Sequence, residues 1–294
     1  MSLPAADSSQ RELVSVGEEV PAPAGQSFLY TLRQENLCVR ECMRFGLRHP
    51  RYLLVGLVLY SWSFPQWKAS RPARMGYAFL QLFDDYMDGD RACPEDLNGV
   101  AERMQCRWEA GRFEPEGVLD RLGQSFYDAL RYLPASEAAV AKADVAELLR
   151  AMHYDFQRRI LRWRLSAKVL EGHLLQTFRP SLSLLLRCAG CRTPVSALPA
   201  VVAALSWCSV VRDFTDDVGN GLINIPKESI PPEVRDAEIL ANPQIQVWLR
   251  EERRRGRGLI DACEIQIKSI ALEDPRAARL LGTFARSMRK YQLD

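Results

Sequence analysis

Lysine is scarce in this chain of 294 residues, which has six lysines, at positions 68, 142, 168, 227, 268 and 290, against 33 arginines. The 39 basic residues nearly balance the 37 acidic ones, so the formal net charge is only +2. A chain with so little excess charge has no broad positive field to attract nucleic acid. The combination of 26% charged and 47% hydrophobic residues excludes the disordered class. We therefore expect a soluble globular protein with no nucleic-acid partner.

Signals for export and for a membrane span are also missing. Residues 1–26 lack the order of basic, apolar and small residues that marks a secretion signal. The longest uncharged run, 193–211, contains several prolines and serines and leads directly into Arg212 and Asp213, which favours a buried helix over a membrane span. We expect a cytoplasmic protein with no transmembrane segment, for which peripheral contact with a membrane stays open.

Cysteine use is modest, with eight residues in all, and we expect reduced thiols. Cys188 and Cys191 have the spacing of a metal or redox pair. They have no second pair and no neighbouring histidine, so we expect no zinc or thioredoxin-like role.

Strand patterns and Gly/Ser-rich linkers are almost absent, whereas apolar residues recur at helical steps, as in Leu119, Leu122, Phe126 and Leu130. This pattern predicts an all-α fold with one large helical domain over 28–294. Residues 1–27 carry prolines without apolar periodicity and are expected to form a flexible leader. Helices are predicted over 75–88, 170–187, 200–217, 245–270 and 276–291. Four prolines between 223 and 243 predict a break.

Paired carboxylates stand at the end of two of these apolar helices. Asp84 and Asp88 are four residues apart, and Asp213 and Asp217 repeat the spacing. On a helix, such residues share one face at about 5–6 Å between Cβ atoms, where carboxylates repel each other unless a cation lies between them. Two pairs that face each other across a bundle would form an oxygen-rich site for Mg²⁺ and a diphosphate, with an apolar pocket behind it. A calcium loop from Asp84 is excluded because Tyr86 stands at its third ligand position.

The segments around these pairs resemble the squalene and phytoene synthase family, all-α enzymes that condense two prenyl diphosphates head to head. YAFLQLFDDYMD at 77–88 is similar to the family's first aspartate motif, and VVRDFTDDVGNGLINIP at 210–226 is similar to its second. The resemblance implies a class I isoprenoid synthase bundle with a central apolar cavity.

The resemblance also implies roles for individual residues. Three Mg²⁺ ions with bound diphosphate would be held by carboxylates, supported by Ser209, and the diphosphate and prenyl chain would contact Arg212, Tyr77, Gln81 and Lys227. The implied metal ligands are Asp84, Asp85, Asp88, Asp213, Asp216 and Asp217. The substrate would be a C10–C20 prenyl diphosphate. NADPH stays an open cofactor, since only squalene-type products need its hydride and no nicotinamide motif is present.

Several positions depart from the family pattern. Gln81 and Leu222 stand where the family has arginines, Ser209 where it has an asparagine that shares a metal, and Tyr60 where it has a phosphate-binding group. These departures affect phosphate binding and leave the carboxylates intact. A single-diphosphate terpene synthase, or a prenyltransferase to a non-prenyl acceptor, therefore stays open beside head-to-head condensation. A non-catalytic assembly factor with the same fold is a further alternative. Chain length, product and oligomeric state are not encoded in these motifs.

Overall fold

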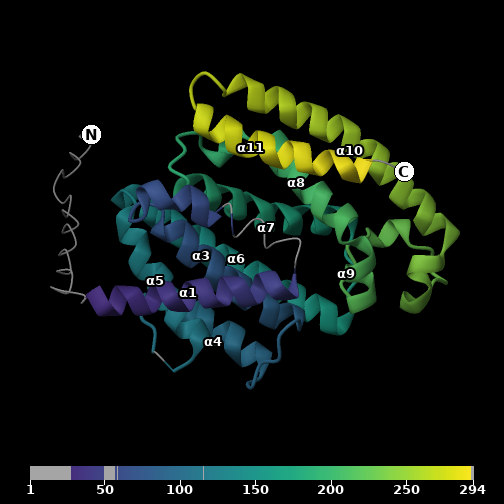
Figure 1. Cartoon of the computed structure of the whole chain (residues 1–294). Coiled ribbons are helices and arrows are strands. Elements are labelled where there is room, and N and C mark those ends of the chain that lie inside the picture. Colours follow the sequence, from purple (N-terminus) through teal and green to yellow (C-terminus); the bar gives the residue numbers. More distant parts are fainter. Residues whose placement is uncertain (1–27, 50–56, 58, 115, 293–294) are drawn as a thin grey trace, which may run out of the picture.

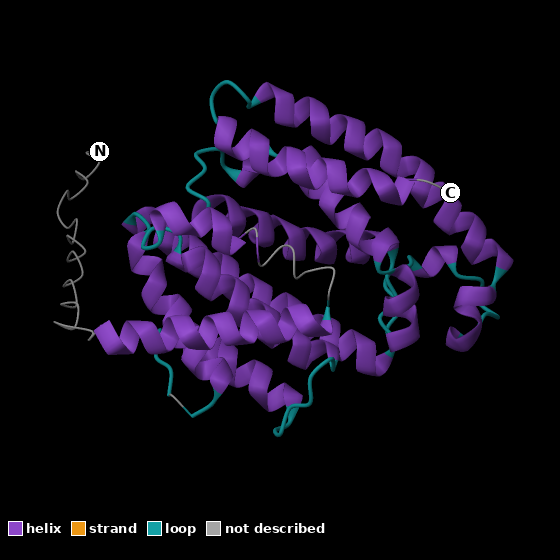
Figure 2. Cartoon of the chain, in the orientation of Figure 1, coloured by secondary structure: helices purple, strands orange, loops and turns teal. Residues whose placement is uncertain are grey.

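The computed structural model of the chain describes residues 28–49, 57, 59–114 and 116–292. Within these ranges every regular element is a helix, which confirms the predicted all-α class (Figure 2). The predicted leader, 1–27, lies outside the described residues, as do residues 50–56 and 58 of the segment between the first two long helices. The long helices are α1 (Phe28–Arg48), α3 (Arg71–Asp88), α4 (Leu97–Ala110), α5 (Val118–Ala129), α6 (Ala135–Leu161), α7 (Ala167–Cys188), α8 (Pro199–Arg212), α9 (Phe214–Asn220), α10 (Pro243–Ser269) and α11 (Pro275–Met288).

The helices enclose two apolar cores that meet at α7 (Figure 1). The first core lies among α1, α3, α4, α5 and α6, and the second among α8, α10 and α11. Along α7, Leu184 and Cys188 belong to the first core, whereas Leu182 and Leu186 belong to the second. Residues two apart lie on opposite sides of a helix. Helix α7 therefore carries apolar residues on two opposite sides because it lies between the two cores.

Local sequence signals set where several helices begin and end. Asp96 caps α4 by accepting a 2.8 Å hydrogen bond from the backbone nitrogen of Gly99, and Gly111 ends that helix at a φ of 63°. Asn242 caps α10 in the same way, followed by Pro243, which has no N–H to leave unpaired. Pro180 lies inside α7 and does not end it.

The predicted helix over 200–217 is wrong at one residue. It ends as α8 at Arg212, and α9 begins at Phe214, because Asp213 has a non-helical ψ of 6°. Short 3₁₀ helices, Lys227–Ser229 and Asp236–Ala241, interrupt the proline-rich segment that follows. Similarly, α11 ends at Met288 and a 3₁₀ turn, Arg289–Gln292, completes the predicted 276–291 helix.

No described helix combines the length and apolar character needed to cross a membrane. The 193–211 run becomes mostly α8, whose residues Val201, Val202 and Trp207 are buried in the second core. Cys188 ends α7, and Gly190, with a φ of 67°, turns the chain before Cys191. Both thiols are free, and burial raises the pKa of Cys188 to about 12 and that of Cys191 to about 11. Thiols with raised pKa values are poor nucleophiles.

Candidate functional site

The first aspartate pair lies on the last turn of α3. Tyr77, Gln81, Asp84 and Asp88 follow one another at steps of four, three and four, so they share one stripe of the helix. Gly89 ends α3 in the left-handed region, at a φ of 78°. A side chain at Gly89 would come within 3.3 Å of Nη1 of Arg159, a residue of α6.

Arg159 places a positive charge at this helix end. Its Nη2 donates to the backbone oxygen of Met87, one of the carbonyls that the end of α3 leaves without an intrahelical partner. Its charge also acts on Asp88 and opposes the effect of burial on the pKa of that carboxyl. Nε of Arg159 is buried and has no hydrogen-bond partner within the described part of the chain.

The second pair spans the break between α8 and α9. The backbone nitrogen of Asp217 donates a 2.8 Å hydrogen bond to the backbone oxygen of Asp213, so one helical turn is kept across the break. Nε of Arg212 lies 2.9 and 3.0 Å from the two carboxylate oxygens of Asp213. Ser209 is half-buried one turn earlier, and its backbone oxygen accepts from the nitrogen of Asp213.

The fold brings the two pairs into one cluster. The pKa of Asp217 is raised to about 7, mainly by burial and also by the charges of Asp213, Asp88 and Asp155, against a hydrogen bond from Asn224 that lowers it. Burial likewise raises the pKa of Asp88 to about 6 and raises the pKa of Asp84, where the charges of Asp88, Asp85 and Asp155 add to it. These aspartates are therefore near enough for their charges to act on one another, but within the described residues no three of their carboxylate oxygens come within 4.8 Å of one another. The protein alone therefore provides too little positive charge to balance these carboxylates.

Asp155 joins the cluster from α6. Its Oδ1 accepts a 2.7 Å hydrogen bond from Nη1 of Arg158 and lies 2.7 Å from Nε2 of His173 on α7. The Arg158 side chain is fully buried. Arg158 thus holds a carboxylate that the two sequence motifs do not include.

Arg158 also fixes the segment that follows α9. Its Nη2 donates to the backbone oxygen of Ile223 at 3.0 Å and to Oδ1 of Asn224 at 3.1 Å. Asn224 in turn donates from Nδ2 to Oδ2 of Asp217 at 2.9 Å. This chain of hydrogen bonds orients Asp217, as outer contacts commonly do for carboxylates that bind metals.

Asp85 is directed to α1 instead. It is buried, it is bonded to Arg48, and its Oδ1 lies 3.6 Å from Nε2 of His49, which is 3.3 Å from Oδ2 of Asp90. Among the described residues, His49, Asp85 and Asp90 are close enough to form a metal group, with ligand atoms within 4.8 Å of one another. Arg48 already supplies positive charge to Asp85, and a His/Asp/Asp group does not identify Mg²⁺.

The remaining predicted residues lie around this site or at the surface. Tyr77 and Gln81 line a narrow recess with Arg48 and Asp85 between α3 and α1. Asp216 is exposed on α9. Lys227 is exposed too, and its backbone nitrogen donates to the oxygen of Leu165 at 2.8 Å.

A pocket of about 360 Å³ runs between α7, α8 and α10 and reaches Asn224. Apolar side chains line most of it, among them Leu170, Leu174, Val210, Trp248 and Leu259. Its volume lies within the range of roughly 300–1,000 Å³ of small-molecule sites. Because Asn224 both lines this pocket and bonds to Asp217, the apolar space and the carboxylate cluster adjoin each other.

Sequence reasoning missed Asp155, Arg158, Arg159, His173 and Asn224. Asp155, Arg158 and Arg159 stand at steps of three and four on α6, one turn of a helix whose other residues include buried apolar ones. Charged residues at this spacing within a helix of buried apolar residues were the signal that could have identified them as site residues. Asn224 stands inside the second aspartate segment, seven residues after Asp217, and that position was its signal. His173 had none, because a tertiary contact alone joins it to Asp155.

Compared with known proteins, the chain matches no protein-family model, no curated protein and no solved structure. The resemblance to squalene and phytoene synthases therefore depends on the two aspartate segments alone.

Proposed function

We propose that the chain is a Mg²⁺-dependent enzyme that ionises an allylic prenyl diphosphate, and that its bundle is of the class I isoprenoid synthase type. The observation that carries the proposal is the meeting of Asp84 and Asp88 with Asp213 and Asp217 beside an apolar pocket. The two pairs are far apart in the sequence, and a merely solvated helix end would not bring the half-buried Asp84, Asp213 and Asp217 near the exposed Asp88.

The donor set fits Mg²⁺. All the clustered ligand atoms are carboxylate oxygens, the type that Mg²⁺ prefers. Their raised pKa values show negative charge that a bound cation would neutralise. Asp84, Asp88, Asp213 and Asp217 would hold the metal, and bound Mg²⁺ would stabilise the leaving diphosphate.

The arginines beside the cluster would bind the diphosphate. Nε of Arg159 is a buried donor with no partner among the residues that the structure describes, beside Asp88. Arg212 is paired with Asp213, and metal binding to that carboxylate would release the guanidinium toward the diphosphate. As the C–O bond breaks, its electron pair leaves with the diphosphate, and the arginines stabilise that charge.

The apolar pocket would receive the prenyl chain and keep water from the allylic cation. Leu170, Leu174 and Val210 contribute no nucleophile, and Trp248 offers an aromatic face that can stabilise a cation. Attack on the cation by the double bond of a second prenyl diphosphate, with loss of a proton, would give a cyclopropylcarbinyl diphosphate. Departure of its diphosphate and rearrangement, ended by loss of a proton or by hydride from NADPH, would give the head-to-head product of the resembled family.

A single-diphosphate reaction is the second candidate. It is favoured by the small number of arginines that lie beside the carboxylates. Arg158 is fully buried and bonded to Asp155, Ile223 and Asn224, which leaves Arg159 and Arg212 beside the carboxylates in the described structure. Two arginines suit one diphosphate. In this reaction the cation cyclises or passes to a non-prenyl acceptor.

Product analysis separates the candidates. Purified protein is incubated with Mg²⁺ and with geranyl, farnesyl or geranylgeranyl diphosphate, alone and with small-molecule extract, and products are identified by mass spectrometry. A hydrocarbon with twice the carbons of the substrate supports condensation. A product with one prenyl unit supports the second candidate. No product with any substrate, together with no thermal shift from Mg²⁺ and diphosphate, would contradict both and favour a non-catalytic assembly factor.

A further inference from the structure

Helix α1 buries its acids beside Cys38 and Phe45, and it exposes several large apolar residues. The residues that face the bundle include Gln34, Glu35 and Glu41, all buried. The residues that face away include Leu29, Met43 and Leu47, which are 64%, 57% and 73% exposed. A helix at the surface of a globular protein usually buries its apolar stripe and exposes its charges.

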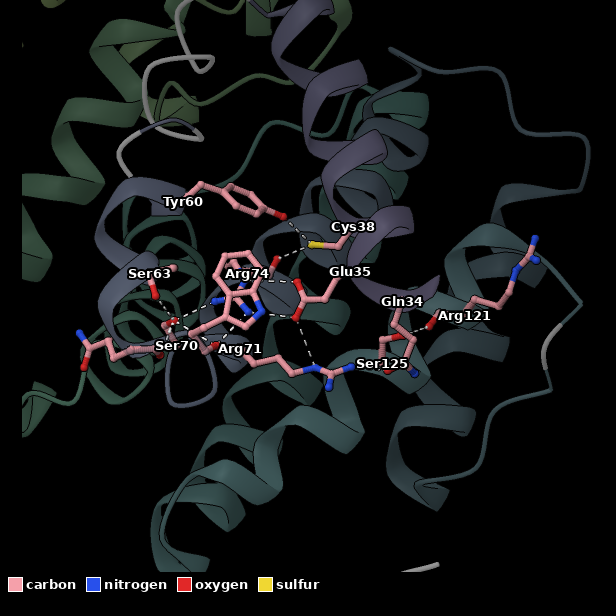
Figure 3. Close-up of polar contacts among 12 residues, drawn as sticks. Gln34, Glu35, Cys38, Tyr60, Ser63, Ser70, Arg71, Arg74, Arg121 and Ser125 are labelled. Carbon is pink, nitrogen blue, oxygen red and sulfur yellow. Dashed lines mark hydrogen bonds and ion pairs between the residues drawn. The ribbon is translucent and has the colours of Figure 1, made fainter. Parts of the chain in front are cut away.

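Buried Glu35 is neutralised by two arginines of α3 (Figure 3). Oε1 of Glu35 accepts a 2.9 Å bond from Nη2 of Arg74, whose side chain is fully buried, and lies 3.7 Å from Nε of Arg71. Arg71 also bonds to Gln34. These contacts fix which side of α1 faces inward, and the apolar side is left outside.

Glu41 is neutralised in the same way, by Nη1 of Arg91 and Nη1 of Arg44, each at 2.7 Å. Glu35 and Glu41 are the two acids of α1. Both are turned inward, so no acidic side chain contributes to the exposed surface of this helix.

The outward face carries an apolar stripe and a basic border. Counted at 100° per residue, the exposed residues Leu29, Leu32, Val39, Met43 and Leu47 fall within a sector of about 80°, which also holds the exposed Asn36. Exposed Arg33, Arg40 and Arg44 follow along one side of it. Over the 18 residue steps from Leu29 to Leu47 the stripe extends about 27 Å. Arginine beside an apolar face is typical of helices that lie in the interface of a bilayer.

We propose that α1 docks this protein on the surface of a membrane that contains anionic lipids. The apolar stripe would enter the boundary between headgroups and acyl chains, and Arg33 and Arg40 would contact the lipid phosphates, whereas Arg44 stays paired with Glu41. A second copy of the chain fits this face less well, because two copies joined through it would bring their arginine borders together. A bilayer supplies both the apolar layer and the negative charge along the whole stripe.

Vesicle sedimentation with the full chain tests the proposal. Vesicles of phosphatidylcholine alone are compared with vesicles that also contain phosphatidylglycerol, at low and at high salt. We expect binding to the anionic vesicles that weakens with salt. Arg33→Gln with Arg40→Gln should lower the partition coefficient about fivefold for each arginine removed. Leu32→Ser, Met43→Ser and Leu47→Ser combined should abolish binding.

The matched control is Arg254→Gln with Arg257→Gln, which removes the same charge from exposed positions on α10 and should bind as the wild type does. All these residues are exposed, so circular dichroism should show unchanged helix content. Equal binding by the wild type and the α1 variants, or no binding to anionic vesicles, would overturn the proposal. A dimer in solution that the triple serine variant converts to a monomer would also overturn it and assign the face to a second copy.

Discussion

Nδ2 of Asn224 donates a 2.9 Å hydrogen bond to the carboxylate of Asp217, while Oδ1 of the same amide accepts from the buried guanidinium of Arg158. One amide thus joins the second aspartate motif to α6. It also lines the apolar pocket. A residue that touches all three parts of the site is the natural place to test whether they act together.

Asn224→Ala should weaken Mg²⁺ binding, because Asp217 loses the contact that orients it. Loss of such outer contacts typically costs about 10- to 100-fold in metal affinity. Titration of activity with Mg²⁺ measures the change. Asn220→Ala, at the exposed end of α9, is the control and should leave the titration unchanged. Equal Mg²⁺ dependence of the Asn224 variant and the wild type would contradict the orienting role.

Stability without metal should fall as the pH rises from about 4 to about 7. The pKa of Asp88 is raised to about 6 and that of Asp217 to about 7 from an ordinary value of 3.8. The folded protein therefore binds more protons than the unfolded chain in this window, and it loses that stabilisation as the protons leave. Thermal denaturation in EDTA should give a lower Tm at pH 8 than at pH 5.

Mg²⁺ should reverse most of this loss at pH 8 and have little effect at pH 5, where protons occupy its ligands. Asp217→Asn should raise the metal-free Tm at pH 8, because it removes a negative charge from the cluster. A Tm in EDTA that increases across this pH range would show that the carboxylates are compensated in the folded protein, against this account.

Arg158→Met should destabilise the fold strongly. It removes the charged partner of Asp155, which keeps only His173, and it removes the bonds to Ile223 and Asn224. Removing one partner of a buried ion pair typically costs about 3–5 kcal/mol. Denaturant unfolding measures the loss, with Arg150→Met, whose side chain is half-exposed and pairs with Glu109, as the control. Similar small losses for both variants would mean that Arg158 does not organise the site.

The contact between α8 and α10 at Trp207 can be tested with two glycine variants of α10. A methyl group at Gly256 would overlap the indole of Trp207, whereas a methyl group at Gly258, two residues along α10, would have no neighbouring atom within 4 Å. Gly256→Ala should lower stability by about 1–3 kcal/mol. Gly258→Ala should raise it by about 0.5–1 kcal/mol. Thermal denaturation of both distinguishes the packing of Trp207 from any general effect of alanine, and equal shifts would argue against the packing.

The sequence was sufficient for the helical class and for the approximate positions of α3, α7, α8, α10 and α11, because apolar periodicity and prolines act locally. It did not predict the break at Asp213, because the residues around it continue the helical pattern. The change of direction there depends on how α9 packs, which is a tertiary contact. The spacing of Asp84 and Asp88 identified a candidate pair. The inward turn of Asp155 and the pairing of Asp85 with Arg48 depend on α6 and α1, which no local pattern connects to the motifs. The sequence also did not predict that α1 buries its acids, because most of the arginines that neutralise them lie on other segments of the chain.

Release of diphosphate from farnesyl diphosphate in the presence of Mg²⁺ is the most direct measurement of the central claim. The wild type should release diphosphate, and Asp84→Asn and Asp213→Asn should each abolish release while remaining folded. Asp261→Asn, at an exposed position of α10, should release it as the wild type does. Equal release by the wild type and both site variants, or unfolding of both variants, would contradict the claim that the two aspartate pairs form one metal and diphosphate site.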